Sequence, residues 1–473
     1  MSSCFLTARR EGPCRGAEGP SARPLVDWGS EIRKIIVRIM DGYVMNIGIV
    51  TTWFESGAGY VSRQYRNALT DRHDVFIYCR GGERRPIGDP EWDGEFVTWG
   101  APPMVNEPSA VDLDHFDAWL RQRRFDAVFF NEQRCWEPVL LCERRSVLTG
   151  AYVVHYTEQT IPLFDAYDFL ICNTRHHYEV FQGHPQALFL PWGTDLQRFR
   201  RPVSYDSVRP GSVTYFLSVG LDPRRKGVDL VLEAFAQLRP GAASPRLVLH
   251  IHPLYDTFYE GRDRVYQESF LRMLESVRKS GDVEVISKAV PDVADLYRLG
   301  DICVYPTRHE GLGLSIAEAL ASGLPLIVSD APPVNEHADG RVVRAVPIRR
   351  YYARSDGDYW PQSQVDVEAL ATAMQEVLDH PEQLPALKRE ARQLAEQKLD
   401  WAANASGLPD FFASVHKIKS ERKEAALKEA KEFEAERTRL NVRNWAGARY
   451  PWMISVGRLS KPLLRPRTQG IRH

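Results

Sequence analysis

The chain has 473 residues, enough for two domains, because a single hydrophobic core rarely grows beyond about 250–300 residues. Its 61 lysines and arginines nearly balance 62 aspartates and glutamates, and the formal net charge of −1 argues against a nucleic-acid-binding surface over the whole chain. The seven cysteines are scattered and form no C-x-x-C pair, so we expect reduced thiols in a cytoplasmic protein and neither a disulfide framework nor a zinc site.

Residues 1–44 are rich in Gly, Pro, Arg and Ser and show no periodicity, which predicts a disordered leader. Within them, Ile32–Met40 is apolar but interrupted by three cations, so it is neither a signal-peptide core nor a membrane span. The first convincing strand begins at Met45, and we hypothesise that Met45 is the true start of the protein.

From Met45 the pattern is strand, glycine loop and helix, which is a Rossmann-like opening with Gly57, Ala58 and Gly59 in the loop. The loop partly matches a dinucleotide fingerprint, but Asp71 and Asp74 come too early for the acidic residue that holds a ribose, so we discount NAD. The glycines indicate that something approaches the backbone here, either a substrate or the next loop.

The first domain, residues 45–205, continues as alternating strands and helices, which predicts a mainly parallel sheet. The predicted strands after the first are Val75–Cys79, Phe96–Trp99, Ala127–Asn131, Ala151–His155, Phe169–Asn173 and Leu188–Pro191, and the helices are Tyr60–Thr70, Leu113–Arg123, Glu137–Arg145 and Arg175–Gln182. His155 would end its strand at the carboxyl edge of the sheet, facing a cleft, where a lone histidine is either structural or part of a site.

A second α/β domain, residues 206–400, opens with a strand at Val213–Val219 and the unusual loop LDPRRKG. Arg224, Arg225 and Lys226 precede a helix from Val228, and helix N-termini disfavour positive charge by about 0.3–1 kcal/mol per cation. Either an anion compensates these cations, or they form a solvated basic loop.

Between Tyr305 and Asp330 the chain reads as a strand end, a glycine turn, a helix and another strand, a βαβ unit with its turn at the ligand-binding edge. Glu310 lies in the turn, and Ser315 is expected to cap the helix, whose exposed N-terminus favours a diphosphate. Glu318 lies in the first helical turn, where it either faces a ligand or completes a capping box with Ser315.

These segments together resemble retaining glycosyltransferases of family 4, which have the GT-B fold of two Rossmann-like domains facing across a nucleotide-sugar cleft. The resemblance spans roughly 45–392, and its most specific part is HEGLGLSIAEALASGLPLIVSD, which is similar to the E-x7-E segment of the family. The other matching segments, in family order, are VHYTE, FLICNTRHH, LPWGTDLQRF and SVGLDPRRKGVDLVLEAF.

The resemblance implies a role for each candidate residue. Lys226, with Arg224 or Arg225, would bind the donor diphosphate, and the departure from the family at Leu221, where an arginine is usual, leaves open which arginine it is. Glu310 would contact the donor sugar and Glu318 the ribose. The other implied site residues are His155 at the reacting face of the sugar, Gly311, Leu312, Gly313 and Leu314 around the donor, and Gly57, Ala58 and Gly59 at the diphosphate and acceptor side.

The implied reaction moves a hexosyl group from a UDP- or GDP-sugar to a glycan or lipid-linked acceptor, as in polysaccharide or glycoconjugate synthesis. Cations at the leaving phosphate would stabilise the developing charge, so we expect no metal ion and no other cofactor. Two alternatives stay open: another GT-B enzyme, such as a sugar-nucleotide epimerase or phosphorylase, and a non-catalytic glycan-binding protein.

The last region, residues 401–473, is expected to be a helical and basic extension. We predict one long helix over Phe411–Val442, with an apolar line that could pack against a partner. From Asn444 onward the chain has six cations, three aromatic residues and no acid, a mixture that suits either an anionic membrane surface or a disordered tail. We therefore expect a cytoplasmic protein with peripheral membrane contact through this tail.

Overall fold

The computed structural model describes the backbone of residues 44–103, 109–200, 211–219, 222–251, 264–288, 290, 292–353 and 360–449. The chain separates into two units, 1–44 and 45–473, and the description below concerns the second. The predicted leader, apart from Val44, the departure at Leu221 and the side chains of the basic tail lie outside the described residues. The proposed domain boundaries stay predictions.

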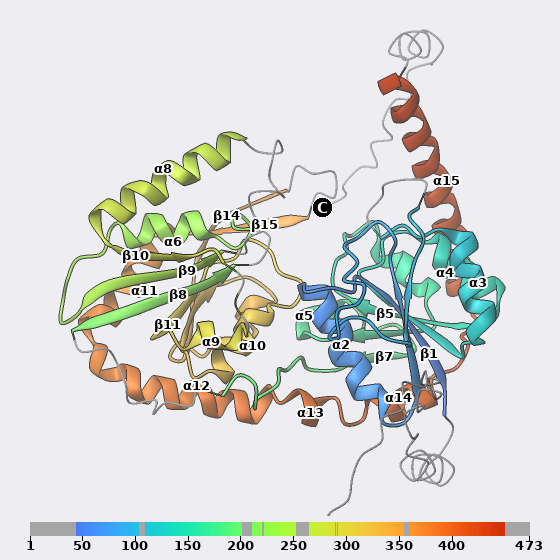
Figure 1. The fold of residues 1–473 in the computed structure, drawn as a ribbon, viewed down its shortest axis with the longest axis horizontal. Helices are drawn as coiled ribbons and strands as arrows, with labels where there is room; N and C mark the ends of the chain where they lie inside the picture. The colour runs from blue at the N-terminus through green and yellow to red at the C-terminus, as the bar shows by residue number, and fades with distance from the viewer. Residues whose placement is uncertain are drawn as a thin grey trace, which may run out of the picture. The chain divides into compact units, whose positions relative to one another are not determined.

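The first sheet has seven parallel strands in the order β3-β2-β1-β4-β5-β6-β7, with helices on both of its faces (Figure 1). Its strands are β1 (Asn46–Thr51), β2 (Asp74–Cys79), β3 (Val97–Trp99), β4 (Ala127–Asn131), β5 (Leu148–Val153), β6 (Phe169–Cys172) and β7 (Ala187–Phe189). Its helices are α2 (Gly57–Thr70), α3 (Leu113–Arg123), α4 (Glu137–Arg144), η1 (Ile161–Ala166) and α5 (Arg175–Phe181). Buried runs such as AVFFN in β4 form central strands because both of their faces are covered.

The second sheet has six parallel strands in the order β10-β9-β8-β11-β12-β13. Its strands are β8 (Ser212–Val219), β9 (Ser244–Ile251), β10 (Asp282–Ile286), β11 (Ile302–Tyr305), β12 (Leu326–Ser329) and β13 (Val343–Val346). Its helices are α6 (Val228–Phe235), α8 (Arg264–Ser280), α9 (Ala294–Tyr297), α10 (Leu314–Ala321) and η2 (Val334–His337). Two Rossmann-like sheets and a helical C-terminal part confirm the predicted fold class.

Each sheet has one place where the direction of winding reverses, and open α/β sheets bind ligands at the carboxyl ends of the strands there. In the first sheet the place lies between β1 and β4, and in the second between β8 and β11. The loops that leave these four strands therefore define where a site is expected.

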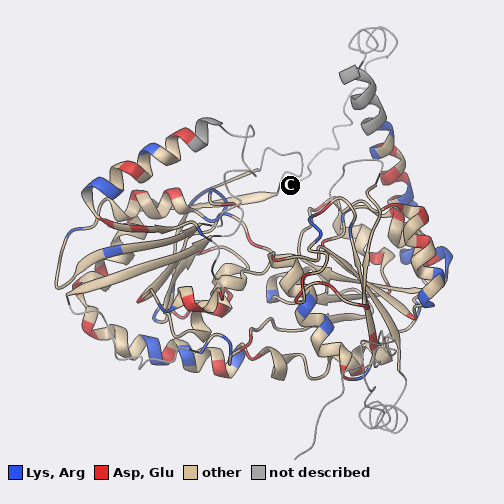
Figure 2. Cartoon of the chain, in the orientation of Figure 1, with Lys and Arg blue, Asp and Glu red and all other residues tan. Residues whose placement is uncertain are grey.

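The C-terminal part runs from the second sheet back to the first. It consists of the hairpin β14 (Ile348–Ala353) and β15 (Pro361–Val365), then α11 (Val367–Asp379), η3 (Pro381–Gln383), α12 (Leu384–Lys398), α13 (Trp401–Asn404), α14 (Leu408–Ser414) and α15 (Glu421–Arg449). Acidic and basic residues are interspersed along α12 and along the described part of α15, as Figure 2 shows, which is typical of helices with a solvent-facing surface.

The prediction of a single helix over Phe411–Val442 is wrong, because α14 and α15 are separated by an extended segment. The buried carboxylate of Asp168 accepts the backbone N–H of Ile418 at 2.9 Å and pairs with Lys417 and Lys423. This contact fixes the break, and Ser420 caps the new helix.

The apolar line predicted for that helix has its partner within the chain. Ala426 and Ala430 are buried in the cluster around Trp136 and Phe164 of the first domain, whereas Phe433 is exposed. α15 therefore packs on η1 and α4.

One predicted strand boundary also needs correction. β5 ends at Val153, so His155 lies in the loop beyond the strand and does not end it. The sequence predicts a longer strand because VVH continues an apolar run. In the structure, Val154 and His155 pair with no neighbouring strand in the described part of the sheet.

Candidate active site

A cavity of 570 Å³ lies among the carboxyl-end loops of both sheets. The first domain supplies Thr52, Glu55, Ser56, Gly57, Ala58, Tyr60, Val61, Glu132, Arg134, Tyr152, Val154 and His155, and the rest of the lining comes from Ser218 to Trp360. The loops that follow β1, β4, β8 and β11 all contribute, so the cavity sits at the reversal point of each sheet. Eleven of the thirteen predicted site residues line it, the exceptions being Arg224 and Gly59.

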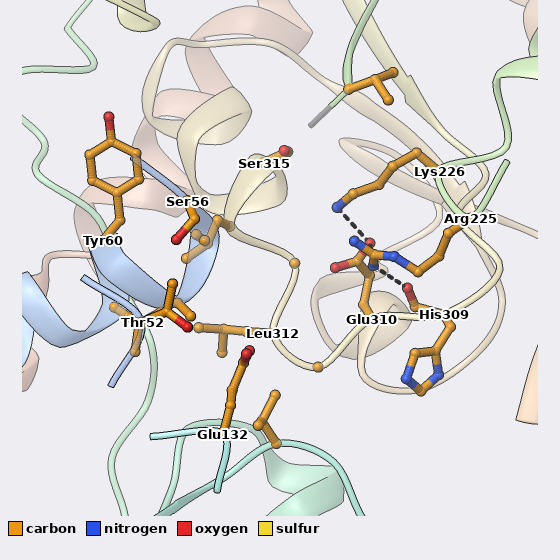
Figure 3. Close-up of a pocket in the computed structure, with 18 of the residues that line it drawn as sticks. Thr52, Ser56, Tyr60, Glu132, Arg225, Lys226, His309, Glu310, Leu312 and Ser315 are labelled. Atoms are coloured by element: carbon orange, nitrogen blue, oxygen red, sulfur yellow. Dashed lines mark hydrogen bonds and ion pairs between the residues drawn. The ribbon is translucent and has the colours of Figure 1, made fainter. Parts of the chain in front are cut away.

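Lys226 and Arg225 reach the cavity from the loop before α6. This loop turns because Asp222 accepts the backbone N–H of Arg225 through Oδ1 at 2.9 Å. Lys226 Nζ lies 2.7 Å from Glu310 Oε1 and also contacts the hydroxyl of Tyr305. Arg225 Nη1 donates to Glu310 Oε1 at 2.9 Å and to the carbonyl of His309 at 2.7 Å (Figure 3).

Arg224 lies on the exposed side of the same loop and does not line the cavity. Its backbone carbonyl accepts a hydrogen bond from Arg308, which also forms a two-pronged ion pair with Asp229 at 2.7–2.8 Å. Of the two arginines left open by the sequence, Arg225 is therefore the one that lines the cavity.

Glu310 is almost completely buried, and a single oxygen, Oε1, receives four hydrogen bonds. The donors are Lys226, Arg225, Tyr305 and Thr307, at 2.7–2.9 Å. Burial alone would raise the pKa of this carboxyl group, but Lys226 and Arg225 outweigh burial and lower the pKa to about 2. Glu310 is thus an anion held in place, and it compensates Lys226 and Arg225, two of the three cations in the loop before α6.

The glycine turn after Glu310 brings the two domains into contact. A Cβ atom on Gly311 would lie 2.0 Å from Val154 Cγ2, so only glycine allows this approach. Gly313 has a φ of +78° and is the N-cap of α10, with no side-chain cap hydrogen bond. Ser315 is therefore inside the helix, and the prediction that it caps the helix is wrong, because the chain already turns at Gly313.

Glu318 forms no capping box. Its Oε2 accepts the hydroxyl of Tyr297 at 2.6 Å, and its side chain lines the cavity. Burial raises the pKa of Glu318, and the hydrogen bond from Tyr297 opposes that shift only in part. The capping-box interpretation of Ser315 and Glu318 is therefore wrong, and Glu318 faces the cavity.

His155 takes part in an aromatic stack at one wall of the cavity. Its ring lies 4.3 Å from that of Trp360, nearly parallel at 19°, and 5.4 Å from that of His309. Burial, followed by the charges of His309 and Arg134, lowers the pKa of His155 well below its usual value. The imidazole is therefore neutral at physiological pH and can donate or accept a hydrogen bond.

The two glycines in the loop after β1, Gly57 and Gly59, have different roles. A Cβ on Gly59 would lie 2.1 Å from the carbonyl oxygen of Phe54, so this glycine serves the turn itself. Gly57 has room for a Cβ and lines the cavity, together with Ala58. Ser56 caps α2 by accepting the N–H of Gly59 at 3.1 Å.

Sequence reasoning missed several lining residues, above all Glu132, Arg134 and Trp360. Glu132 follows β4 directly, at the reversal point of the first sheet, so the strand order contains the signal that would have found it. Trp360 directly precedes β15, the second strand of a hairpin that sequence patterning did not predict.

Two Rossmann-like sheets in one chain, with a cavity lined from the carboxyl ends of both, define the GT-B class of proteins. Residues 213–380 match the family model described as glycosyl transferases group 1. The chain is 29% identical over 235 residues to D-inositol 3-phosphate glycosyltransferase of Rhodococcus opacus, a match that covers 46% of this chain and 46% of that protein. These matches support the predicted resemblance to family 4 glycosyltransferases with the GT-B fold.

Solved structures show the same fold over more of the chain. Sucrose-phosphate synthase from Thermosynechococcus elongatus has a TM-score of 0.61 at 17% identity, covering 78% of this chain and 98% of that one. HepE of Anabaena in complex with UDP has a TM-score of 0.57 at 13% identity, and the match covers 79% of this chain and 100% of HepE. The sequence match spans less than half of the length of D-inositol 3-phosphate glycosyltransferase.

Proposed function

We propose that this protein is a retaining, metal-independent hexosyltransferase that uses a UDP- or GDP-sugar and a glycan or lipid-linked acceptor in polysaccharide or glycoconjugate synthesis. The observation that carries the proposal is the convergence of Lys226, Arg225 and Glu310 in the cavity beside the N-terminus of α10.

The diphosphate of the donor would bind at the start of α10. The first N–H groups of a helix have no partner within it, and Gly313 offers no side chain to cap them. Gly311, Leu312, Gly313 and Leu314 all line the cavity, so these groups face the space where the phosphates would lie. Lys226 and Arg225 would stabilise the negative charge that grows on the leaving phosphate, each such group contributing a few kcal/mol.

Glu310 would bind the transferred sugar. Oε1 is occupied by its four donors, whereas no described residue donates to Oε2. An anionic oxygen in a buried position is a strong acceptor for a sugar hydroxyl. The two cations would then be shared between Glu310 and the diphosphate.

Glu318 would bind the nucleotide through the ribose hydroxyls, with Tyr297 fixing the orientation of the carboxyl group. His155 would contact the sugar on the side of the reacting carbon. HepE, which has this fold, was crystallised with UDP, and this supports a nucleotide-sugar donor.

Metal independence is proposed because Lys226 and Arg225 already supply positive charge where a divalent ion would neutralise the diphosphate. Retention of the anomeric configuration rests on the family resemblance. NMR of the product anomeric proton tests it, and inversion would contradict the proposal.

The donor site can be tested by binding alone. Purified protein is screened against UDP, GDP and ADP by thermal shift in EDTA, since a ligand at 100 times its dissociation constant stabilises by about 2.7 kcal/mol. We expect one nucleotide to shift the unfolding temperature without metal. If every nucleotide requires magnesium, or none binds, the proposed site is wrong.

We also propose that the basic tail from Asn444 holds the enzyme at an anionic membrane surface, an idea that rests on its sequence. Within the described residues no helix is long and apolar enough to span a membrane. Sedimentation with anionic liposomes at low salt should require the tail. If the full-length protein never sediments with them, the anchor is ruled out.

A further inference from the structure

Glu132 is held in an uncommon backbone conformation at the wall of the cavity. Its φ is +53°, in the left-handed region that residues other than glycine seldom adopt and that is retained when neighbouring contacts impose it. Arg80 fixes the preceding peptide by donating to the carbonyl of Asn131 at 2.8 Å. The amide of Asn131 donates to the Ala58 carbonyl at 2.9 Å and to Ser62 Oγ at 2.7 Å.

This anchoring directs the Glu132 side chain into the cavity. Figure 3 shows the carboxylate rising from the first domain toward Thr52 and Leu312. The nearest described cationic or imidazole group is Nε2 of His155, at 4.0 Å, which is beyond hydrogen-bond distance. The side chain of Glu132 is 34% exposed, and burial raises the pKa of its carboxyl group. Within the described residues, no side chain donates a hydrogen bond to this carboxylate, so its oxygens are open to donors that enter the cavity.

The surroundings of Glu132 are rich in acceptors. Glu55 lines the same half of the cavity, together with the hydroxyl groups of Thr52, Ser56 and Tyr60. Two cations lie on this side: Arg80 is buried and pairs with Glu83, and Arg134 packs over the ring of Trp360 at 4.5 Å. Among the described lining residues four glutamates face three permanent cations, and the donor diphosphate would occupy two of those cations, Arg225 and Lys226.

We propose that the part of the acceptor that enters this cavity is a neutral, polyhydroxylated group, a sugar or polyol without a phosphate, whose hydroxyls donate to Glu132. This inference rests on the proposed function and specifies its acceptor. A phosphate beside Glu132 and Glu55 would meet like charge in a partly desolvated space. By contrast, the names of D-inositol 3-phosphate glycosyltransferase and sucrose-phosphate synthase refer to phosphorylated compounds.

The test uses the full chain, the donor nucleotide sugar identified by binding, and matched acceptors. Each pair contains a free and a phosphorylated compound: inositol and inositol 3-phosphate, fructose and fructose 6-phosphate, glucose and glucose 6-phosphate. We expect at least one free compound to be used with a kcat/KM about tenfold or more above that of its phosphorylated partner.

Variants at position 132 decide whether this residue causes the preference. Glu132→Gln should lower kcat/KM for the free acceptor about tenfold, and Glu132→Lys should move the preference toward the phosphorylated partner. Glu91→Gln serves as the control, because Glu91 pairs with Arg63 on the surface away from the cavity lining. Nucleotide affinity should be unchanged in all three variants.

The outcomes separate this inference from the donor-site proposal. Failure to bind any nucleotide contradicts the proposed function, whatever the acceptors do. If the nucleotide binds, the inference is overturned by a preference for phosphorylated acceptors, by transfer to no free compound, or by an unchanged preference in Glu132→Lys.

Discussion

Glu310 and Glu132 are two carboxylates of one cavity in opposite environments. Glu310 has a saturated oxygen, two cationic neighbours and a pKa lowered to about 2. Glu132 has an unpartnered carboxylate and a pKa raised by burial. The difference comes from the loops: those of the second sheet place Arg225 and Lys226 against Glu310, whereas those of the first place mainly hydroxyl and carboxyl groups, with Arg134, around Glu132.

The comparison indicates different roles for two halves of the cavity. The half around Glu310 would bind the donor, and the half around Glu132 would bind the acceptor. A saturated carboxylate is already oriented, so the proposed donor half would need little rearrangement before it binds. An unpartnered carboxylate would obtain its hydrogen bonds from a substrate, so the proposed acceptor half would determine selectivity. Four measurements test this division, from the largest expected effect to the smallest.

The pH dependence of stability should have opposite signs for the two residues. The folded pKa of Glu310 lies below its ordinary value of 4.5, so its contribution is present above pH 4.5 and is lost as the pH falls toward 2. The full shift corresponds to about 3 kcal/mol. Urea unfolding should therefore show Glu310→Gln well below wild type at neutral pH, with the gap closing in acid.

Glu132→Gln supplies the opposite case in the same experiment. A raised folded pKa means that the ionised carboxylate opposes folding above its ordinary pKa, so removing the charge should increase the free energy of unfolding at neutral pH. If both variants shift in the same direction, the contrast between the two environments is wrong.

Glu310→Gln should also lower kcat by about a hundredfold or more, while nucleotide affinity stays nearly unchanged. Contacts of Glu310 with the sugar should tighten as charge develops at the reacting carbon, whereas Lys226 and Arg225 remain to hold the diphosphate. Steady-state kinetics and nucleotide titration measure the two effects. A change confined to KM would place Glu310 on the nucleotide instead.

Much of the fold could be predicted because buried parallel strands are continuous apolar runs. β4 was predicted to the residue, as Ala127–Asn131, and β8 within one residue. The β14–β15 hairpin was missed because its sequences, IRRYYA and PQSQV, are partly polar and exposed. The break before α15 was missed because Asp168, about 250 positions earlier in the sequence, causes it.

The site was predicted where chemistry is local in sequence. The cations before α6 and the glutamates around the glycine turn stand out by spacing alone. Their mutual hydrogen bonds do not, since Lys226 and Glu310 are 84 residues apart. Glu132 carried no local signal, because NEQR resembles an ordinary polar loop and only the strand order places it in the cavity.

Lys226→Ala should weaken nucleotide binding about tenfold or more, because one of two cations at the diphosphate is lost. Arg224→Ala is the matched control: it lies in the same loop but outside the cavity lining, and it should change the affinity less than about twofold. Calorimetric titration with the nucleotide that the thermal-shift screen identifies compares the affinities of the two variants. Equal losses in both variants would mean that loop charge in general, and not the cavity, sets the affinity.

Glu318→Gln should have the smallest effect of the four, an increase of about threefold in donor KM with kcat nearly unchanged. Ribose contacts are the same in the ground state and the transition state, so losing one weakens binding without slowing the chemical step. The start of α10 should keep its stability, because Glu318 takes no part in a capping box there.

Tyr297→Phe is a useful comparison, since it removes the hydroxyl that orients Glu318 but leaves the charge. We expect it to raise donor KM less than Glu318→Gln does. Steady-state kinetics with the true donor provides the measurement. If Glu318→Gln instead lowers kcat while Glu310→Gln changes only KM, the two glutamates have exchanged roles, and the saturated carboxylate would be the one that holds the nucleotide.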